Sequence, residues 1–567
     1  MVKKHGLWYA IKYYALIQHL LFAVALYFVN PYALQLFCKL TNVTERSMFY
    51  KIYIYLVPIA LAALWIYVFF TVTRDKSYRY QTNRSYGYDH SHYQRSYYDL
   101  IDYFKDADPY QMNTDKLTTK SWKNCEGMIL GKTKNGKLLN IESGADGRNY
   151  FIFGLPSTGK TAGPIICSCL RFGMDHPLAA NNKKTFGSVF CIDLKNDIWK
   201  ATHKYRRIKR FNLMEPEHST HFNPFAGIEK LSIDERCNFI ENIGFNIIPA
   251  ATGGSGDGKY FSDTAYDFWN GIALYLLHKD INTSFPDVIK AILAGNAVDW
   301  VKEVCASDCE EAKRRLQSKW GENEKNLSGG YSLCAGNCRK FASDKLFFLL
   351  GNDPQYEYIS VQTLEDGWDC YIQLDVAEID NYSSLLSMIV QTFLSGFLTR
   401  QNNPNAGRLP DGTLRPVLMC LDEFSKLATL KYEIVATAFM LLRSNNISIA
   451  CALQSKSSIS EMFHSENACM SLIDCVTTFC FLSIQEVQTR EWASKLIGNR
   501  KVLRVSNSLN NGSNGNENTG RSVQETIEPI FQPADFGNLI DKNEGRDEII
   551  VYSQGKYIKA DKQYYFK

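Results

Sequence analysis

The longest uncharged stretch of the chain lies near its beginning and predicts a membrane-spanning helix. Residues 52–72 contain no charged side chain, and a helix of that length, at about 1.5 Å per residue, matches a bilayer core of about 30 Å. A second span is expected at 7–29, where Lys12, Gln18 and His19 interrupt the apolar run. We therefore expect a two-helix anchor with a short external loop over 1–75.

Basic residues flank this expected anchor. Lys3 and Lys4 precede the first span, and Arg74 and Lys76 follow the second, so the positive-inside rule predicts that both flanks are cytosolic. Basic residues between the spans weaken that argument. A cleaved signal peptide is the alternative for the first span, although no small-residue cleavage motif is present.

A tyrosine-rich linker is expected over 76–120, where Tyr86, Tyr88 and Tyr93 stand among arginines and histidines. An interfacial aromatic belt that continues into a solvated linker is the preferred interpretation. Base-stacking platforms for a nucleic acid are the alternative.

Beyond the linker, short apolar runs alternate with segments of helical periodicity. Strands are predicted at 149–153, 188–193, 207–214, 369–376, 416–421, 447–453 and 477–484, and helices at 161–172, 383–400 and 432–445. This alternation predicts an α/β fold with a mainly parallel sheet covered on both faces. The segments 121–225 and 369–567 are expected to form that domain.

About 140 residues separate the two parts of the predicted sheet domain, which is far more than a connection needs. Helical periodicity recurs at 263–278, 285–293 and 308–320. We therefore expect an inserted all-α domain over 226–368. The glycine-rich stretch 253–258 lacks a Gly-Lys-Thr ending and is interpreted as a turn.

Composition places the chain among ordinary globular proteins. Its 567 residues are 45% hydrophobic and 22% charged, with a net charge of +4. These values exclude a disordered chain and a polybasic nucleic-acid coat, and the length indicates two to four folding units. Sixteen cysteines scattered through apolar stretches favour a reducing compartment.

Three further patterns leave alternatives open. Two CxxxC pairs, Cys305 with Cys309 and Cys334 with Cys338, have a spacing that permits zinc ligation, although cysteines on one helix face are usually small hydrophobic residues. The basic run 200–210 fits either a contact with nucleic-acid phosphates or a solvated or inter-subunit face. The polar segment 507–518 is interpreted as a flexible surface loop.

A phosphate-binding loop follows the predicted strand 149–153. Gly154 to Thr161 match G-x-x-x-x-G-K-[ST] in the order strand, loop, helix. Lys160 is expected to reach the β- and γ-phosphates of ATP, and Thr161 to ligate Mg²⁺. A chance glycine turn is the alternative. The residues expected to contact the nucleotide are Gly154, Pro156, Ser157, Thr158, Gly159, Lys160, Thr161 and Ala162.

Two carboxylates end the apolar strand 416–421. In this position Asp422 is expected to ligate Mg²⁺, and Glu423 to act as the general base on the attacking water. A helix cap is the alternative for such a pair. Gln454 ends the next predicted strand, where an amide can sense the γ-phosphate.

These motifs together resemble the type IV secretion system coupling proteins, also called TraG/TraD-type conjugative ATPases. The motifs that carry the resemblance are the two spans, the loop at Gly154, the block 191–197, Phe222-Asn223-Pro224-Phe225, Asp422-Glu423 and Leu453-Gln454-Ser455. The block departs from the family pattern, because Asn196-Asp197 stands where the family usually shows Gly-Glu.

The resemblance implies a RecA-like P-loop ATPase in the bacterial inner membrane, multi-pass and mostly cytoplasmic. It implies a homo-hexamer that delivers DNA, as a relaxase-bound single strand, and/or protein substrates to other secretion-system components. It also implies that Arg148 and Arg443 reach the phosphates of a neighbouring subunit, whereas ordinary surface arginines are the alternative. A substrate-docking protein with a mainly structural nucleotide site and an FtsK-type DNA translocase are the other functions considered.

Overall fold

The computed structural model describes residues 31–32, 35, 39, 117–120, 125–133, 136–143, 147–173, 187–248, 256–427, 429–511, 517–541 and 545–566. Both expected membrane spans and most of the linker 76–120 lie outside these residues. Within the described part, no helix is both long and apolar enough to cross a bilayer.

The chain divides into two compact units. The larger consists of Met112–Ala493 with Gln532–Lys567, and the smaller includes Ser494–Phe531. The sheet and the helices of the expected insertion both belong to the larger unit. The segment Ser494–Phe531, which was expected to be part of the domain 369–567, belongs to the smaller unit.

One large sheet organises the larger unit, and its strands follow the order β1-β3-β2-β15-β14-β10-β4-β9-β8-β5-β7-β6, with β13 paired to β14. The strands are β1 Leu117–Lys120, β2 Met128–Lys132, β3 Leu138–Ile141, β4 Asn149–Phe153, β5 Ser188–Ile192, β6 Ile208–Asn212, β7 Asp369–Gln373, β8 Val417–Leu421, β9 Ile447–Leu453, β10 Thr478–Phe481, β13 Ile540–Asp541, β14 Arg546–Ser553 and β15 Lys556–Asp561. Strand β1 begins at Leu117, so the last residues of the expected linker belong to the sheet.

The strands from β10 to β6 run parallel, which confirms the mostly parallel sheet predicted from the apolar runs. Their carboxyl ends therefore meet at one edge of the sheet. Antiparallel strands extend the sheet on the other side of β10, starting with β14 and β15. This extension was not predicted, because three of its strands, β1, β2 and β3, lie about 400 residues before the others.

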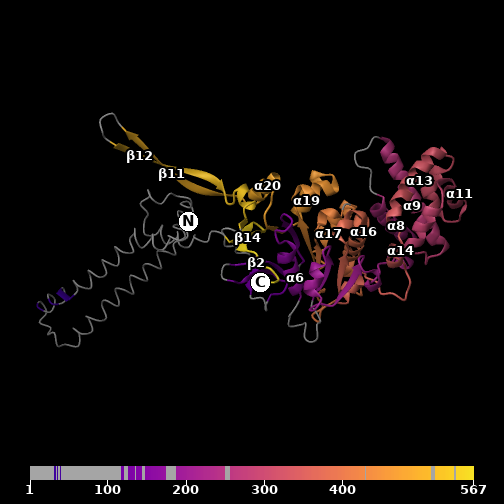
Figure 1. The fold of residues 1–567 in the computed structure, drawn as a ribbon, viewed down its shortest axis with the longest axis horizontal. Coiled ribbons are helices and arrows are strands. Elements are labelled where there is room, and N and C mark those ends of the chain that lie inside the picture. The colour runs from indigo at the N-terminus through magenta and orange to yellow at the C-terminus, as the bar shows by residue number, and fades with distance from the viewer. Residues whose placement is uncertain are drawn as a thin grey trace. The chain divides into compact units, whose positions relative to one another are not determined.

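Helices cover both faces of the parallel part (Figure 1). They are α6 Ile166–Arg171, α7 Asp197–Thr202, α16 Ile379–Leu398, α17 Tyr432–Leu441, α18 Ser457–Phe463, α19 Glu466–Asp474 and α20 Val487–Ile497. On one face Phe190 of β5 packs against Phe393 of α16, with ring centroids 4.7 Å apart. On the other face Ile152 and Cys191 join a buried cluster with Cys169 of α6. Side chains alternate between the faces, as the pleat of a strand requires.

Between β6 and β7, all regular structure in the described residues is helical. These helices are α8 Ile233–Ile247, α9 Gly256–Lys279, α10 Phe285–Ala294, α11 Ala297–Ala306, α12 Glu310–Leu316, α13 Glu324–Cys338, α14 Asp344–Leu349 and α15 Val361–Glu365. Helix α9 packs against α8, α12 and α13, and Figure 1 shows this group to one side of the sheet. The expected turn at 253–258 is wrong for its second half, since α9 begins at Gly256.

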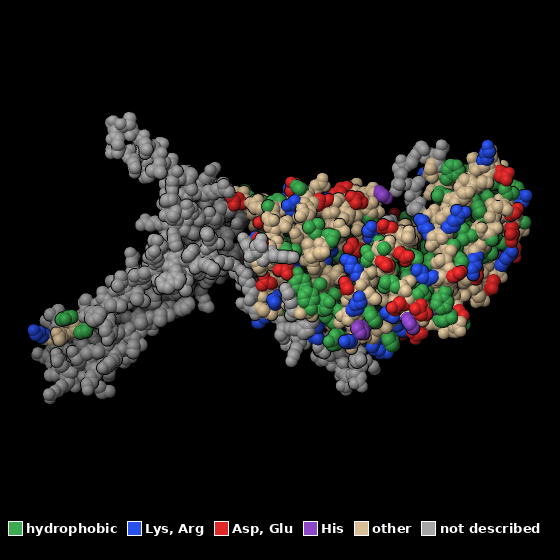
Figure 2. Space-filling view, in the orientation of Figure 1, with side chains coloured by type: hydrophobic (Ala, Val, Ile, Leu, Met, Phe, Trp, Pro, Cys, Tyr) green, Lys and Arg blue, Asp and Glu red, His purple; other side chains and the backbone are tan. Residues whose placement is uncertain are grey.

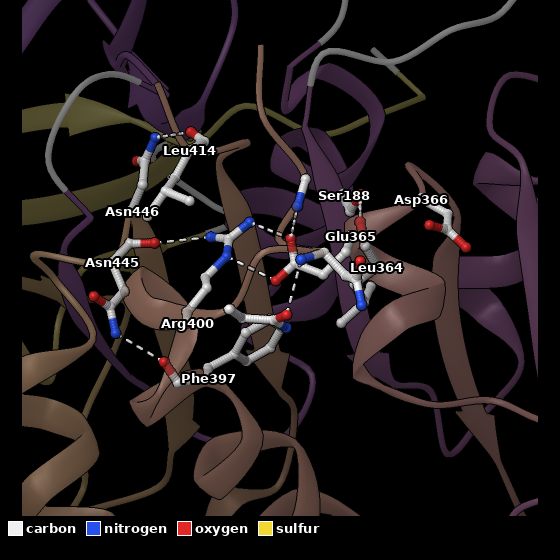
Figure 3. Close-up of polar contacts among 12 residues, drawn as sticks. Ser188, Leu364, Glu365, Asp366, Phe397, Arg400, Leu414, Asn445 and Asn446 are labelled. Atoms are coloured by element: carbon white, nitrogen blue, oxygen red, sulfur yellow. Dashed lines mark hydrogen bonds and ion pairs between the residues drawn. The ribbon is translucent and has the colours of Figure 1, made fainter. Parts of the chain in front are cut away.

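A buried ion pair lies at the edge of the sheet where the parallel strands begin, opposite the edge where their carboxyl ends meet (Figure 3). Arg400 and Glu365 are fully buried and form two hydrogen bonds of 2.8 and 2.7 Å. Arg400 also donates to the Asn445 carbonyl at 2.8 Å, and Asn445 donates to the Phe397 carbonyl at 2.7 Å. The network joins α15 and α16 to the turn between α17 and β9.

The two CxxxC pairs do not form a metal site. Cys309, Cys334 and Cys338 are buried, and Cys305 is half-buried. Within the described residues, no group of three or more potential ligands comes together. Burial raises the pKa of the Cys305 and Cys309 thiols. These cysteines are small hydrophobic residues of the helical region.

The basic run 200–210 is largely engaged within the protein. Arg206 is fully buried and forms an ion pair with Asp369, so it lies neither on a solvated face nor at a phosphate contact. The guanidinium of Arg207 lies 4.0 Å from the ring centroid of Trp368, and that of Arg210 lies 4.6 Å from the ring centroid of Trp199. Figure 2 shows acidic and basic side chains interspersed over the described surface on the face drawn.

The smaller unit contains a long antiparallel ribbon formed by β11 Asn499–Asn511 and β12 Glu517–Pro529. The predicted flexible loop at 507–518 is therefore wrong for Asn507–Asn511 and for Glu517 and Asn518. Polar composition indicated that this segment buries little apolar surface, but ribbon pairing is made by backbone hydrogen bonds that any residue except proline can form.

Candidate functional site

The glycine loop begins directly at the carboxyl end of β4. Its amides bond to the last residue of β9 and to a residue just beyond β10: Gly154 N donates to the Leu453 carbonyl and Leu155 N to the Ser483 carbonyl, each at 3.0 Å. Ser157 and Gly159 have positive φ angles of 64° and 91°, which curl the loop so that successive N–H groups can face an anion.

A helix continues from the loop, as expected. It starts with a π-helical turn, Thr161–Ile165, and passes into α6. Pro164 inside the turn has no N–H to donate, which accounts for the widened first turn. The amino end of the helix therefore faces the loop, where its dipole favours negative charge.

Lys160 is held at the centre of this loop. Its ammonium group donates to the Gly154 carbonyl at 2.5 Å and to the Leu155 carbonyl at 3.0 Å, and the residue is 7% exposed. Burial lowers the pKa of Lys160, while the charges of Glu423 and Asp422 raise it. The loop lysine and the two distant carboxylates thus share one electrostatic environment.

Thr161 and Asp422 are in direct contact. The Thr161 hydroxyl donates to Asp422 Oδ2 at 2.9 Å. Asp422 Oδ1 is buried and has no hydrogen-bond partner among the described residues. Burial raises the pKa of Asp422 to about 6, partly offset by the Thr161 hydrogen bond. A hydroxyl beside an unsatisfied carboxylate oxygen is an oxygen donor set that suits Mg²⁺.

Glu423 and Gln454 lie at the same sheet edge. Glu423 adopts a left-handed conformation with φ 61° and ψ 46°, which is uncommon for this residue type and typical of functional sites. Gln454 follows β9 and is exposed. Because β9 runs between β4 and β8, Gln454 stands between the glycine loop and the acidic pair.

Arg148 and Arg443 lie at the opposite end of these strands. Arg148 directly precedes β4, and its backbone N–H donates to the Ser448 hydroxyl at 3.0 Å. Gly147 N donates to the Arg443 carbonyl at 3.0 Å, so the two arginines are neighbours. Arg148 is 6% exposed, whereas Arg443 is exposed. Neither arginine adjoins the glycine loop of its own chain.

The block 191–197 lies at the carboxyl end of β5, at the same edge of the sheet as the glycine loop and the acidic pair. Asp193 accepts from Ile198 N at 3.2 Å and from Trp199 N at 2.7 Å, which caps α7. Asn196 has φ 62°, a conformation that glycine adopts most readily and asparagine next. This explains why asparagine can replace the family's glycine here. Lys195, a member of this block for which the sequence predicted no role, is exposed, and its charge acts on Lys160 and Asp422.

The segment after β15 was also missed. Lys562 donates to the Thr158 carbonyl at 2.9 Å, although the two residues are 404 positions apart. No local pattern predicts such a contact; the only available signal was the aromatic run at 564–566.

Residues 110–567 match a protein-family model that is described as type IV secretory system conjugative DNA transfer. The chain belongs to the type IV secretion system coupling protein family. No curated protein matches it.

Solved structures of conjugative coupling proteins share the fold. Unbound TrwBdeltaN70 aligns with a TM-score of 0.55 and 14% identity, covering 80% of this chain and 94% of that one. TrwB in complex with the non-hydrolysable ATP analogue ADPNP gives a TM-score of 0.55 and 13% identity over 80% and 94%. TrwB with ADP and Mg²⁺ gives 0.54 and 13% over 80% and 96%.

Proposed function

We propose that this coupling protein is an ATP hydrolase whose turnover moves a substrate into a secretion channel. The proposal rests above all on one contact: the Thr161 hydroxyl, which follows the loop lysine, meets Asp422 at 2.9 Å. That contact joins the glycine loop and the acidic strand end into a single site. The unsatisfied Asp422 Oδ1 is the atom that a bound cation or its water would use.

Each residue of the site has a proposed task. The loop from Gly154 to Ala162 holds the triphosphate through backbone N–H groups, and Lys160 turns from the loop carbonyls to the β- and γ-phosphates. Thr161 and Asp422 hold Mg²⁺, which when bound neutralises charge on the phosphates. Glu423 takes the proton of the attacking water, and Gln454 senses the γ-phosphate.

The arginine positions favour an assembly of several subunits. Because Arg148 and Arg443 lie at the sheet edge opposite the loop, they can reach phosphates only across a subunit interface, as in the homo-hexamer that the family resemblance implies. Arg443 is the better candidate for this task, since its side chain is exposed whereas Arg148 is buried.

The proposed setting is the bacterial inner membrane, with the expected spans at 7–29 and 52–72 as anchor. The family description, conjugative DNA transfer, favours DNA as cargo, carried as a relaxase-bound single strand, with protein substrates as a further class. The helical region α8–α15 is the proposed substrate-engaging domain, and other secretion-system components are the proposed partners.

Phosphate release from ATP by the purified full chain tests the proposal. Lys160→Ala should abolish release above background while leaving membrane insertion intact, and Lys200→Ala, an exposed lysine on α7, should retain wild-type turnover. Unchanged turnover in Lys160→Ala would refute the assigned site.

A further inference from the structure

The segment 562–566 lies directly on the phosphate-binding loop. Lys562 is buried between the Thr158 carbonyl at 2.9 Å and Asp547 Oδ1 at 3.0 Å. Three residues later, Tyr565 N donates to the Ala162 carbonyl at 3.2 Å. A side-chain bond and a main-chain bond therefore attach this segment to the middle of the phosphate-binding loop and to the residue that follows the loop.

Tyr564 fixes an aromatic group in this place. Its hydroxyl donates to Asp547 Oδ1 at 3.1 Å, and its ring lies so close to Gly159 that a Cβ there would be 2.7 Å from the ring. Phe566 stacks on Tyr564 with ring centroids 5.3 Å apart and an interplanar angle of 16°. Tyr565 meets Phe566 edge-on at 5.1 Å and 82°.

The outer two rings of this group are open to solvent, although Tyr564 is anchored by its hydrogen bond to Asp547. Tyr565 is 39% exposed and Phe566 is 63% exposed. Exposed aromatic faces beside an anion-binding loop are the feature that base-stacking sites present to a nucleotide.

The sheet order places this aromatic group on the side of the loop away from the acidic pair. Asp422 ends β8, which lies on one side of β4, beyond β9. Asp547, which holds Lys562 and Tyr564, belongs to β14, which lies on the other side of β4, beyond β10. A triphosphate whose γ end faces Asp422 therefore directs its α end, its sugar and its base toward 562–566.

We propose that Tyr565 and Phe566 form the base-stacking subsite for a nucleoside triphosphate bound in this loop. The subsite rests on the proposed function, because it needs a nucleotide whose phosphates occupy the loop. Stacking uses the π-face that every base has, so the subsite accepts adenine and guanine alike. Lys562 and Tyr564 are positioning residues that hold the platform against the loop.

Comparison of ATP with inorganic tripolyphosphate tests the subsite, because the second ligand has the phosphates and lacks the base. Calorimetric titration of the full chain, with Mg²⁺ present, should show that Tyr565→Ala/Phe566→Ala lowers the affinity for ATP by about 5- to 100-fold. The affinity for tripolyphosphate should stay within about twofold of wild type, because the variant leaves the phosphate contacts in place.

Two control variants separate stacking from folding. The swap Tyr565→Phe/Phe566→Tyr keeps both aromatic faces and should bind ATP as wild type does. Tyr205→Ala removes a tyrosine of the larger unit that is 56% exposed and should change the affinity for neither ligand.

The outcomes separate the two proposals. Unchanged ATP affinity in Tyr565→Ala/Phe566→Ala overturns the subsite, and equal loss of ATP and tripolyphosphate overturns it too, since the segment then only braces the loop. Wild-type protein that binds neither ligand overturns the proposed function together with the subsite.

Discussion

The Thr161 hydroxyl donates a hydrogen bond of 2.9 Å to Asp422 Oδ2 across 261 positions of sequence. The contact exists because both residues follow carboxyl ends of parallel strands, β4 and β8, that are separated only by β9. It joins the phosphate-binding loop to the acidic pair, and the chemistry proposed for the site depends on this contact.

Glu423→Gln should bind ATP with near wild-type affinity and lower the rate of hydrolysis by about 10²- to 10⁴-fold. Glutamine keeps the size of the side chain and the left-handed backbone, but it accepts no proton from water. Stopped-flow binding and single-turnover phosphate release measure the two effects separately. Glu461→Gln, an exposed position on α18, serves as control, and normal turnover in Glu423→Gln would show that water is activated elsewhere.

The affinity for Mg²⁺-nucleotide should depend on pH through Asp422. Burial raises the pKa of this carboxyl to about 6, so the group takes up a proton as pH falls through that value and then cannot bind a cation. Calorimetry from pH 5 to 8 should show affinity rising with pH, with a midpoint near 6. Asp422→Asn should lack this dependence, and an equally steep profile in that variant would assign it to another group.

The same shift has an opposite effect on the stability of the nucleotide-free protein. Because the folded-state pKa of Asp422 lies above its unfolded value, the folded state binds more protons between roughly pH 4 and 6, and ionisation there lowers stability as pH rises. Asp422→Asn should therefore raise the unfolding temperature at pH 7 while it abolishes hydrolysis. A lower unfolding temperature would mean that the carboxylate is stabilised by contacts other than those described.

Arg443→Ala should lower turnover by about 10³- to 10⁵-fold if its guanidinium reaches the phosphates of a neighbouring subunit. Mixing this variant with Lys160→Ala tests the arrangement directly. In a mixed assembly, Lys160→Ala subunits supply Arg443 to the intact nucleotide sites of Arg443→Ala subunits. Partial recovery of phosphate release on mixing is expected. Full activity of Arg443→Ala alone would contradict the role, and Arg490→Ala is a control on α20.

Arg400→Met should destabilise the larger unit by about 3–5 kcal/mol, since it leaves Glu365 buried without its cation. The shift of the urea midpoint measures this loss. Lys279→Met breaks an ion pair with Glu303 whose side chains are 55% and 48% exposed, and it should cost much less. Equal costs for both substitutions would show that the buried pair adds little.

The strands that carry the site could be predicted because their apolar runs are short and are followed by the glycine loop or by polar residues. Strands β4 and β9 occupy the residues predicted, 149–153 and 447–453. Parallel packing then brings their carboxyl ends together without further information, so the proximity of Thr161 and Asp422 followed from motif order.

Long-range contacts with no local pattern could not be predicted. Nothing near Lys562 indicates that its ammonium group bonds to Thr158. Within the basic run, no charge pattern distinguishes Arg206, which pairs with Asp369 inside the protein, from its neighbours. The ribbon of β11 and β12 could not be predicted either, because its strands pair through backbone hydrogen bonds, which require no particular pattern of apolar side chains.

The most direct test of the account is the effect of Mg²⁺ on ATP affinity in wild type, Thr161→Ala and Asp422→Asn, measured by titration with Mg²⁺ and then with a chelator. Wild-type protein should bind ATP more tightly when Mg²⁺ is present, and both variants should lose that difference while they still bind ATP without the metal. Full retention of the Mg²⁺ effect in Asp422→Asn would contradict the claim that the glycine loop and the acidic strand end form one site.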